Sequence, residues 1–229
     1  QAFGELFLQS SGSDYRCADG TPARDFDTVF RGSCTGFRYD GSATFANLES
    51  IAPQRAPVLI AGAGPVGLLV ALQLARFGVG CTVVEAEPGL THDLRAGTFH
   101  PPTIEMLEAV GVAAPMLELG IKVPRWQSWD LAHGLVAEWD LSLLANDTPY
   151  PFRLHLEQHR LTPIIYGLLK QHPHVQVLFG HRFESMSQHA DHVQAELVAG
   201  SERVSVRAQW VVGADGGRSQ VRKSAEIEF

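Results

Sequence analysis

Three glycines and one carboxylate in this sequence have the types and spacing of a phosphate-binding turn. Gly62, Gly64 and Gly67 follow a short apolar run, and Glu85 stands further along the chain. The first glycine permits a tight turn, the second lets the backbone approach a pyrophosphate, and the third allows a helix to pack closely on a strand. A carboxylate about 20 residues later can accept hydrogen bonds from ribose hydroxyls. The pattern predicts a site for FAD or NAD, because an acid disfavours the 2′-phosphate of NADP.

The segments on either side of this turn are those that such a site requires. Residues 58–61 are a continuous apolar run, typical of a parallel strand that is buried on both faces. Residues 68–75 carry apolar side chains at helical spacing. The N-terminus of this helix, including the N–H group of Val66, favours a bound anion. Pro65 suits the first helical turn, where a missing N–H group removes no hydrogen bond.

Further elements follow from the pattern of apolar residues. Short apolar runs predict strands at 81–85 and 175–179, and amphipathic segments predict helices at 101–107 and 158–169. Alternating segments at 183–188, 192–198 and 203–209 predict a three-stranded meander. Residues 209–213 predict a further strand that ends in an Asp-Gly turn. Between 125 and 156, short strand-like pieces predict an antiparallel sheet.

From residue 57 to 229 the sequence resembles the flavin-dependent aromatic hydroxylases of the p-hydroxybenzoate hydroxylase fold, which are single-component monooxygenases. The resemblance rests on the stretch around the glycines, on segment 94–97 with the helix after it, on Glu157-Gln158, and on segment 212–219. It implies an α/β fold: a Rossmann-type FAD-binding domain with a parallel sheet and a three-stranded meander, plus part of an antiparallel substrate-domain sheet.

The resemblance also assigns cofactor-binding residues beyond the first turn. It implies that Arg95, Ala96 and Gly97 wrap the pyrophosphate and ribityl chain of FAD, and that Gln158 hydrogen-bonds the ribityl or phosphate region. Asp215 and Gly216 match the Asp-Gly motif that touches the FAD pyrophosphate. An arginine beside a pyrophosphate donates charge-assisted hydrogen bonds. Capping of a helix N-terminus is the structural alternative for Gln158.

The activity implied by the resemblance is hydroxylation of a phenolic or related aromatic substrate. In the family, NAD(P)H reduces FAD, and reduced FAD captures O₂ as a C4a-hydroperoxide that hydroxylates the ring. The cofactor does the redox work, so no catalytic acid or base is predicted. Two alternatives stay open: a flavin oxidoreductase that inserts no oxygen, and an FAD-binding fragment without activity of its own. The family's third fingerprint, a Gly-Asp pair before a Pro- and Gly-rich helix start, does not occur in the sequence.

The predicted domains follow the same reasoning. Residues 57–120 and 157–229 form the FAD-binding domain, and residues 121–156 form part of the substrate domain. Residues 1–56 are an atypical N-terminal segment, for which a rearranged order of the chain is one hypothesis.

The composition excludes several classes of function. A net charge of −7 leaves no excess of Lys and Arg for nucleic acid. No apolar run approaches the ~20 residues that span a bilayer, and the first residues lack the features of a signal peptide. Three scattered cysteines predict neither a disulfide framework nor a metal site. We therefore expect a cytoplasmic protein. The family resemblance implies that its partners are a small aromatic substrate and O₂, with a homodimer allowed.

Several weaker patterns favour structure over chemistry. Cys34, between Gly32 and Gly36, has the spacing of a nucleophile elbow, but the strand before it and the helix after it that such an elbow requires are missing from the sequence pattern. The histidine pairs at 172/174 and 189/192 are expected to be solvated loop residues, and Cys81 a buried thiol. The tryptophans at 126, 129 and 139 line a substrate-facing sheet or pack in a core; the sequence leaves both open.

Overall fold

The computed structural model describes residues 7–10, 55–91 and 97–228 of the chain. These residues fall into two compact units. Unit 1 takes in residues 1–90 and 168–229, and unit 2 takes in residues 91–167. The units follow compactness alone, so the functional domain boundaries expected from the sequence stay predictions.

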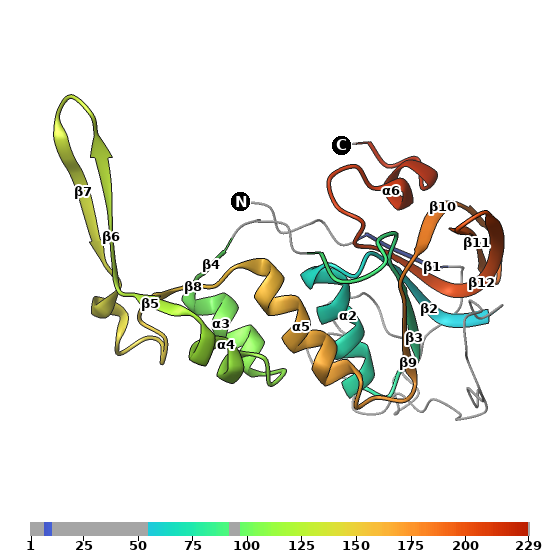
Figure 1. Ribbon diagram of the computed structural model, residues 1–229, viewed down its shortest axis with the longest axis horizontal. Coiled ribbons are helices and arrows are strands. Elements are labelled where there is room, and N and C mark those ends of the chain that lie inside the picture. The colour runs from blue at the N-terminus through green and yellow to red at the C-terminus, as the bar shows by residue number, and fades with distance from the viewer. Residues whose placement is uncertain (1–6, 11–54, 92–96, 229) are drawn as a thin grey trace. The chain divides into compact units, whose positions relative to one another are not determined.

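Unit 1 is built on one mixed sheet with the order β10-β11-β12-β2-β3-β9, and β1 also pairs with β12 (Figure 1). The pairs from β12 through β2 and β3 to β9 are parallel, and β10, β11 and β12 form an antiparallel meander. The predicted Rossmann-type sheet with a three-stranded meander is therefore confirmed. The strands are β1 (Phe7–Ser10), β2 (Arg55–Ala61), β3 (Cys81–Val84), β9 (Val175–Leu178), β10 (His181–Gln188), β11 (Val193–Ala199) and β12 (Glu202–Gly213).

The sheet of unit 1 is covered on both faces, which explains the uninterrupted apolar run in β2. Leu59 belongs to a buried cluster with Leu197 of β11 and Val211 of β12. Ile60 is also fully buried but lies outside that cluster, as expected for the next side chain along a strand. Helix α2 (Pro65–Arg76) packs against β2 and β3 and buries the predicted apolar stripe.

Strand β12 differs from the sequence prediction in its length. Residues 203–209 and 209–213 were expected as two elements, but they form one strand of 12 residues. Its first part pairs with β11 in the meander, and its last part pairs with β2 in the parallel sheet. No Gly, Pro, Asn or Asp occurs between Glu202 and Val212, so the chain passes from one pairing to the other without a break.

Unit 2 contains two small antiparallel sheets where the sequence predicted one. The first has the order β4-β8-β5, and the second is the hairpin of β6 and β7. Their bounds are β4 (Thr98–Phe99), β5 (Ile121–Val123), β6 (Arg125–Asp130), β7 (Gly134–Asp140) and β8 (Arg153–His155). Helix α3 (Pro101–Glu108) agrees with the prediction.

Four short elements of unit 2 were missed: β4, β5, helix α4 (Ala113–Leu119) and the 3₁₀ turn η1 (Leu141–Leu144). Helix α4 is only 7 residues long and has no side-chain cap, so its local signal is weak. Helix α5 (Gln158–Leu169) was predicted with the same bounds.

Candidate functional site

The glycine turn, residues 62–67, joins β2 to α2 at the carboxyl end of the parallel sheet of unit 1. Gly62 has a φ of 104°, which L-residues with a Cβ rarely adopt. Gly64 is the N-cap of α2, and its φ of −70° is ordinary. The turn is anchored by a hydrogen bond of 2.7 Å from the Gly62 N–H to the carbonyl oxygen of Val84 in β3.

Two of the three glycines are required by packing against neighbouring backbone. A Cβ added at Gly67 would lie 1.9 Å from the carbonyl oxygen of Gly62. A Cβ added at Gly62 would lie 2.4 Å from the carbonyl oxygen of Ala214, which follows β12. The glycine turn thus touches the Asp-Gly turn (residues 214–219), because β2 and β12 are parallel neighbours that end side by side.

Gly64 differs from the other two glycines because the space beside it is open. A Cβ added at Gly64 would meet no atom within 4 Å. The first-turn N–H groups of α2, such as those of Val66 and Gly67, have no carbonyl partner within the helix. The first turn also contains no acidic side chain that would compete for them. A cradle that is open at one glycine and lined by N–H groups fits a pyrophosphate, and hence the adenosine diphosphate half of FAD.

Glu85 comes directly after β3 and turns its carboxylate toward the glycine turn. Its Oε2 accepts a hydrogen bond of 2.7 Å from the backbone N–H of Ala63, and its Oε1 accepts one of 3.1 Å from the N–H of Glu87. Each carboxylate oxygen has two lone pairs, so both oxygens keep capacity for ribose hydroxyls. The carboxylate therefore holds the turn in place and keeps lone pairs that ribose hydroxyls could use.

Asp215 also uses its carboxylate within the protein. Its Oδ1 accepts a hydrogen bond of 2.5 Å from the hydroxyl of Ser219, and its Oδ2 accepts one of 2.6 Å from the N–H of Gln220. Ser219 in turn caps helix α6 (Gln220–Ser224) through the N–H of Arg222. Asp215 thus fixes the turn, and Gly216, with a φ of 82°, lets the backbone reverse there.

The site residues predicted in unit 2 lie where two segments meet. The N–H of Leu156 donates a hydrogen bond of 2.8 Å to the carbonyl oxygen of Gly97. A Cβ at Gly97 would lie 3.1 Å from the carbonyl oxygen of Leu156, so the close approach favours glycine. Gln158 is half-buried at the first residue of α5. Arg95 and Ala96 lie outside the described residues.

The four histidines expected to be solvated lie in loops, but His172, His174 and His192 are half-buried and only His189 of the four is exposed. Burial raises the pKa of the Cys81 thiol from 9.0 to about 12, so this cysteine is inert at neutral pH. No group of three potential metal ligands occurs among residues 55–91 and 97–228. The same residues contain no helix that is long and apolar enough to span a membrane. Cys34 lies outside the described part of the chain.

Core packing is excluded for two of the three tryptophans. Trp129 is 65% exposed and Trp139 is 41% exposed. Trp126 is half-buried, and its ring stacks on that of Trp139 with centroids 3.8 Å apart and an interplanar angle of 8°. These rings lie on the β6–β7 hairpin of unit 2 rather than in a core.

Three residues of the site were missed in the sequence. Ala63 supplies the N–H group that Glu85 holds, Ala214 packs against two glycines, and Ser219 caps α6. Only the role of Ser219 could have been predicted from the sequence, because a serine directly before a short helix is a common N-cap. The other two act through the backbone and by being small.

Comparison with known proteins adds independent information. A model of the family described as FAD binding domain matches residues 55–229. Para-nitrophenol 4-monooxygenase from Pseudomonas sp. (strain WBC-3) is 34% identical over 175 residues, which are 75% of this chain and 43% of that protein.

Two solved structures are also similar. That of p-nitrophenol 4-monooxygenase PnpA from Pseudomonas putida DLL-E4 has a TM-score of 0.74 and 33% identity, over 77% of this chain and 45% of that one. That of the flavin-dependent monooxygenase PieE in complex with FAD and substrate has a TM-score of 0.69 and 28% identity, over 77% of this chain and 33% of that one. The chain spans less than half the length of these three relatives.

Proposed function

This chain belongs to the FAD binding domain family, and from that premise we propose that the protein is an FAD-dependent aromatic monooxygenase. The relatives named above are monooxygenases, and two of them are named for p-nitrophenol. The proposed substrate is a small phenolic or related aromatic molecule. O₂ and NAD(P)H are the proposed co-substrates, and the protein is proposed to act in the cytoplasm, as a monomer or a homodimer.

The observation that carries the proposal is the convergence of three turns at one end of the unit 1 sheet. The glycine turn follows β2, Glu85 follows β3, and the Asp-Gly turn follows β12. These strands are parallel neighbours, so their carboxyl ends meet at one edge, where open α/β sheets bind their ligands. The open space at Gly64 lies at this edge.

The backbone groups and side chains of the predicted site each have a proposed role in holding FAD. The N–H groups after Pro65 receive the pyrophosphate, and Glu85 receives the adenosine ribose. Arg95, Gly97 and Gln158 hold the ribityl and phosphate region, as the family resemblance implies. Asp215 acts through the turn that it fixes, because a carboxylate placed directly on a pyrophosphate would repel it.

Bound FAD, once reduced, would supply the chemistry that activates O₂ and transfers one oxygen atom to the aromatic ring. The C4a-hydroperoxyflavin route implied by the resemblance belongs to this proposal. The chain's own residues bind and orient the cofactor, and no side chain among those described is assigned a proton transfer. A flavin oxidoreductase that inserts no oxygen is the second candidate.

The test is a purification followed by turnover measurements. We expect a yellow protein with bound FAD, whose NAD(P)H oxidation is stimulated by a phenol and yields a product that is heavier by one oxygen atom. Oxidation of NAD(P)H without an oxygenated product from any phenol in the panel would favour the second candidate. A protein that takes up no FAD would overturn both.

A further inference from the structure

Strand β12 of unit 1 changes its neighbour halfway along one of its two edges. Residues 207 and 208 pair with β11 and with β2 at the same time, so these two strands lie on opposite edges of β12. Pairing with β11 ends at Ala208, whereas pairing with β2 continues to Gly213. The edge that β11 leaves is therefore open to another strand from residue 209 onward.

Strand β1 occupies the edge that β11 leaves (Figure 1). Its four residues pair antiparallel with β12, from Phe7 opposite Gly213 to Ser10 opposite Trp210. Residues 210–213 already pair with β2 on their other edge, so β1 has to lie on the edge that β12 shares with β11. Among the strands that the structure describes, only β1 pairs with this part of that edge.

The part of β12 that β1 covers lies in the core of unit 1. Val211 and Val212 are fully buried there. Buried backbone N–H and C=O groups need hydrogen-bond partners, and an antiparallel neighbour supplies them at alternate residues. Strand β1 thus provides the pairing that this half of β12 cannot obtain from β11.

The same part of β12 leads directly into the candidate cofactor site. Gly213 is followed by Ala214, whose N–H donates a hydrogen bond of 2.8 Å to the carbonyl oxygen of Ala61. The carbonyl oxygen of Ala214 lies 2.4 Å from the place of a Cβ added at Gly62, and its side chain lies 3.3 Å from that of a Cβ added at Gly67. Because the contacts are this close, a sideways shift of the end of β12 would disturb the glycine turn.

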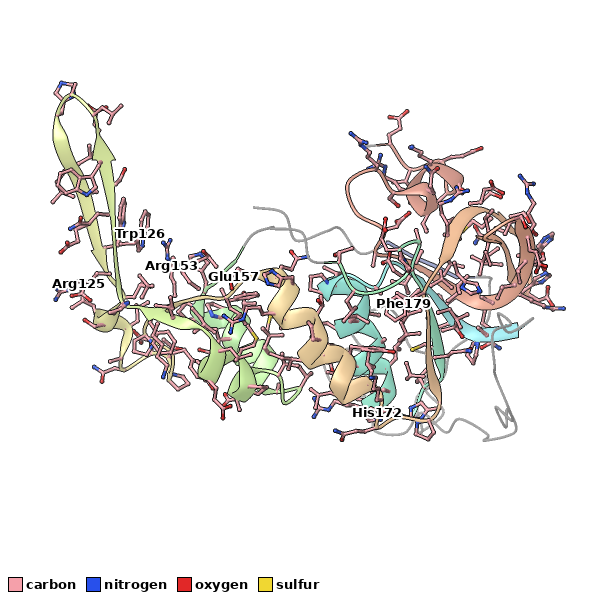
Figure 2. All side chains as sticks on the ribbon, in the orientation of Figure 1. Arg125, Trp126, Arg153, Glu157, His172 and Phe179 are labelled. Atoms are coloured by element: carbon pink, nitrogen blue, oxygen red, sulfur yellow. The ribbon has the colours of Figure 1, made fainter. Side chains whose placement is uncertain are left out.

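The other two strands that end in the site are also paired on both edges. Strand β2 lies between β12 and β3, and β3 lies between β2 and β9. The N–H of Glu85, just after β3, donates a hydrogen bond of 2.9 Å to the carbonyl oxygen of Leu178 in β9, and Phe179 follows at the same end (Figure 2). Strand β1, which has four residues like β9, takes the equivalent place beside β12.

We propose that β1 is a strap, and that its pairing with β12 and the binding of FAD stabilise each other. The strap fixes the end of β12, and with it the Asp-Gly turn and the glycine turn, so FAD meets a site that is already ordered. Coupling of this kind is reciprocal, so bound FAD holds β1 on the sheet by the same factor.

This inference rests on the proposed function, because it concerns the same cofactor site. It adds a part of the chain that the family does not describe, since the match to the family model begins at residue 55.

The test disrupts the backbone pairing of β1 in the full chain. One of any two neighbouring residues in an antiparallel strand donates its N–H to the partner strand, so Leu8→Pro/Gln9→Pro removes at least one such donor. Leu8→Val/Gln9→Thr is the matched control, because it changes the same two side chains but keeps both N–H groups and residues that favour strands. A fluorescence titration gives the FAD dissociation constant, and hydrogen exchange is followed with and without FAD.

We expect the proline variant to bind FAD about 5- to 100-fold more weakly, the usual size of a coupling between two sites. Exchange at residues 210–213 should become faster in this variant, while exchange at residues 203–206, which pair with β11, stays unchanged. The control variant should match the unmodified protein in both measurements. In the unmodified protein, FAD should slow exchange at residues 7–10.

Equally tight FAD binding by the proline variant and the unmodified protein would overturn the inference. So would exchange at residues 7–10 that is the same with and without FAD. Faster exchange at residues 203–206 would reveal a proline variant that is unfolded as a whole, and the effect of FAD on residues 7–10 of the unmodified protein then decides.

The outcomes are separate from those that test the proposed function. An unmodified protein that takes up no FAD refutes that function, whereas FAD uptake that is equal with and without the prolines refutes the strap alone.

Discussion

At the scale of single residues, the candidate cofactor site depends on which positions have room for a side-chain atom. Gly67 and Gly62 have none, because carbonyl oxygens lie within 2.4 Å of the places where their Cβ atoms would be. Gly64 has room for a Cβ in the structure without a ligand. Two of the three glycines of the motif are therefore required by the fold, and Gly64 is the one that we propose serves the ligand.

We predict that Gly67→Ala and Gly64→Ala fail in different ways. Gly67→Ala forces a Cβ against the backbone and should lower the free energy of unfolding by about 1–3 kcal/mol or more. Gly64→Ala should change that free energy by less than about 0.5 kcal/mol. It should nevertheless weaken FAD binding roughly tenfold, about 1.4 kcal/mol, by filling the space proposed for the pyrophosphate.

Denaturant unfolding of the apoprotein and a fluorescence titration with FAD measure the two effects separately. Unimpaired FAD binding by Gly64→Ala would contradict the proposed position of the pyrophosphate.

A second prediction at this scale concerns Glu85. Glu85→Ala removes the acceptor for the Ala63 N–H and the proposed partner of the ribose, so FAD binding should weaken at least about tenfold. Glu85→Gln keeps one carbonyl oxygen and should lose less. Glu87→Gln is the control, because the Glu85 carboxylate contacts only the backbone N–H of Glu87. Flavin content after purification and the FAD dissociation constant are the readouts; equal flavin content in Glu85→Ala would refute the ribose assignment.

At the scale of elements, the site depends on how strands and helices end. Strands β2 and β12 lie side by side in parallel, and the N–H of Ala214 donates a hydrogen bond of 2.8 Å to the carbonyl oxygen of Ala61. The turn after β12 then passes into α6 through Asp215 and Ser219. The ends of two neighbouring strands thus share one packed junction, which a change in either turn should disturb.

We predict that Asp215→Ala destabilises this junction first and FAD binding second. The carboxylate accepts hydrogen bonds from the Ser219 hydroxyl and the Gln220 N–H, so its loss should lower stability by about 0.5–2 kcal/mol, the range for helix caps. Asp215→Asn retains one oxygen acceptor and should lose less stability. Thermal unfolding of the apoprotein is the measurement. An Asp215→Ala variant of unchanged apoprotein stability but poor FAD binding would instead make Asp215 a direct ligand.

Strand β3 gives a prediction that depends on pH. Cys81 is buried in β3, with a folded pKa of about 12 against 9.0 for an exposed thiol. The raised pKa means that this group favours the folded state fully below pH 9.0, and that the contribution is lost as the pH rises toward 12.

In a Cys17→Ser/Cys34→Ser background, iodoacetamide at pH 8 should therefore label native protein about a thousandfold more slowly than urea-unfolded protein. Rapid labelling of the native protein would show that β3 is accessible.

At the scale of the whole molecule, exposed apolar side chains are distributed unevenly. In the described residues, the large exposed apolar side chains lie between positions 106 and 144 of unit 2, with the exception of Phe77. Several of them, including Trp129, Leu131 and Val136, belong to the β6–β7 hairpin and its turn. Exposed apolar surface of this kind promotes association and dye binding without contributing to the stability of the unit.

We predict that polar substitutions on the hairpin improve solubility without loss of stability. Leu131, at the hairpin turn, is fully exposed, and Val136 is 63% exposed. The double variant Leu131→Ser/Val136→Thr should change the free energy of unfolding by less than about 0.5 kcal/mol while reducing binding of an apolar dye. Leu154→Ala, in the buried face of the neighbouring sheet, is the contrast and should lose about 2–5 kcal/mol. A large loss of stability in the double variant would show that the hairpin is covered in solution.

The sequence by itself determined the features that depend on local spacing. The glycine turn, the acid after the second strand, the meander and the two longest helices follow from the periodicity of apolar residues and from the conformations that glycine and proline allow. The family resemblance added the cofactor, because it combined four separated segments that no single motif could connect. Helix α4 and strand β5 escaped because short, uncapped elements depend on tertiary contacts.

Only the tertiary structure decided why the glycines and acids of the motifs are needed. Ala214 meets Gly62 and Gly67 because β12 is the parallel neighbour of β2, a pairing of segments about 150 positions apart that no periodicity encodes. The structure likewise shows that the Glu85 carboxylate accepts a hydrogen bond from the glycine turn and that the Asp215 carboxylate accepts one at the start of helix α6. It also joined Arg153 to Trp126, which the sequence separates by 27 positions. Such contacts depend on strand order and register, which the fold sets as a whole.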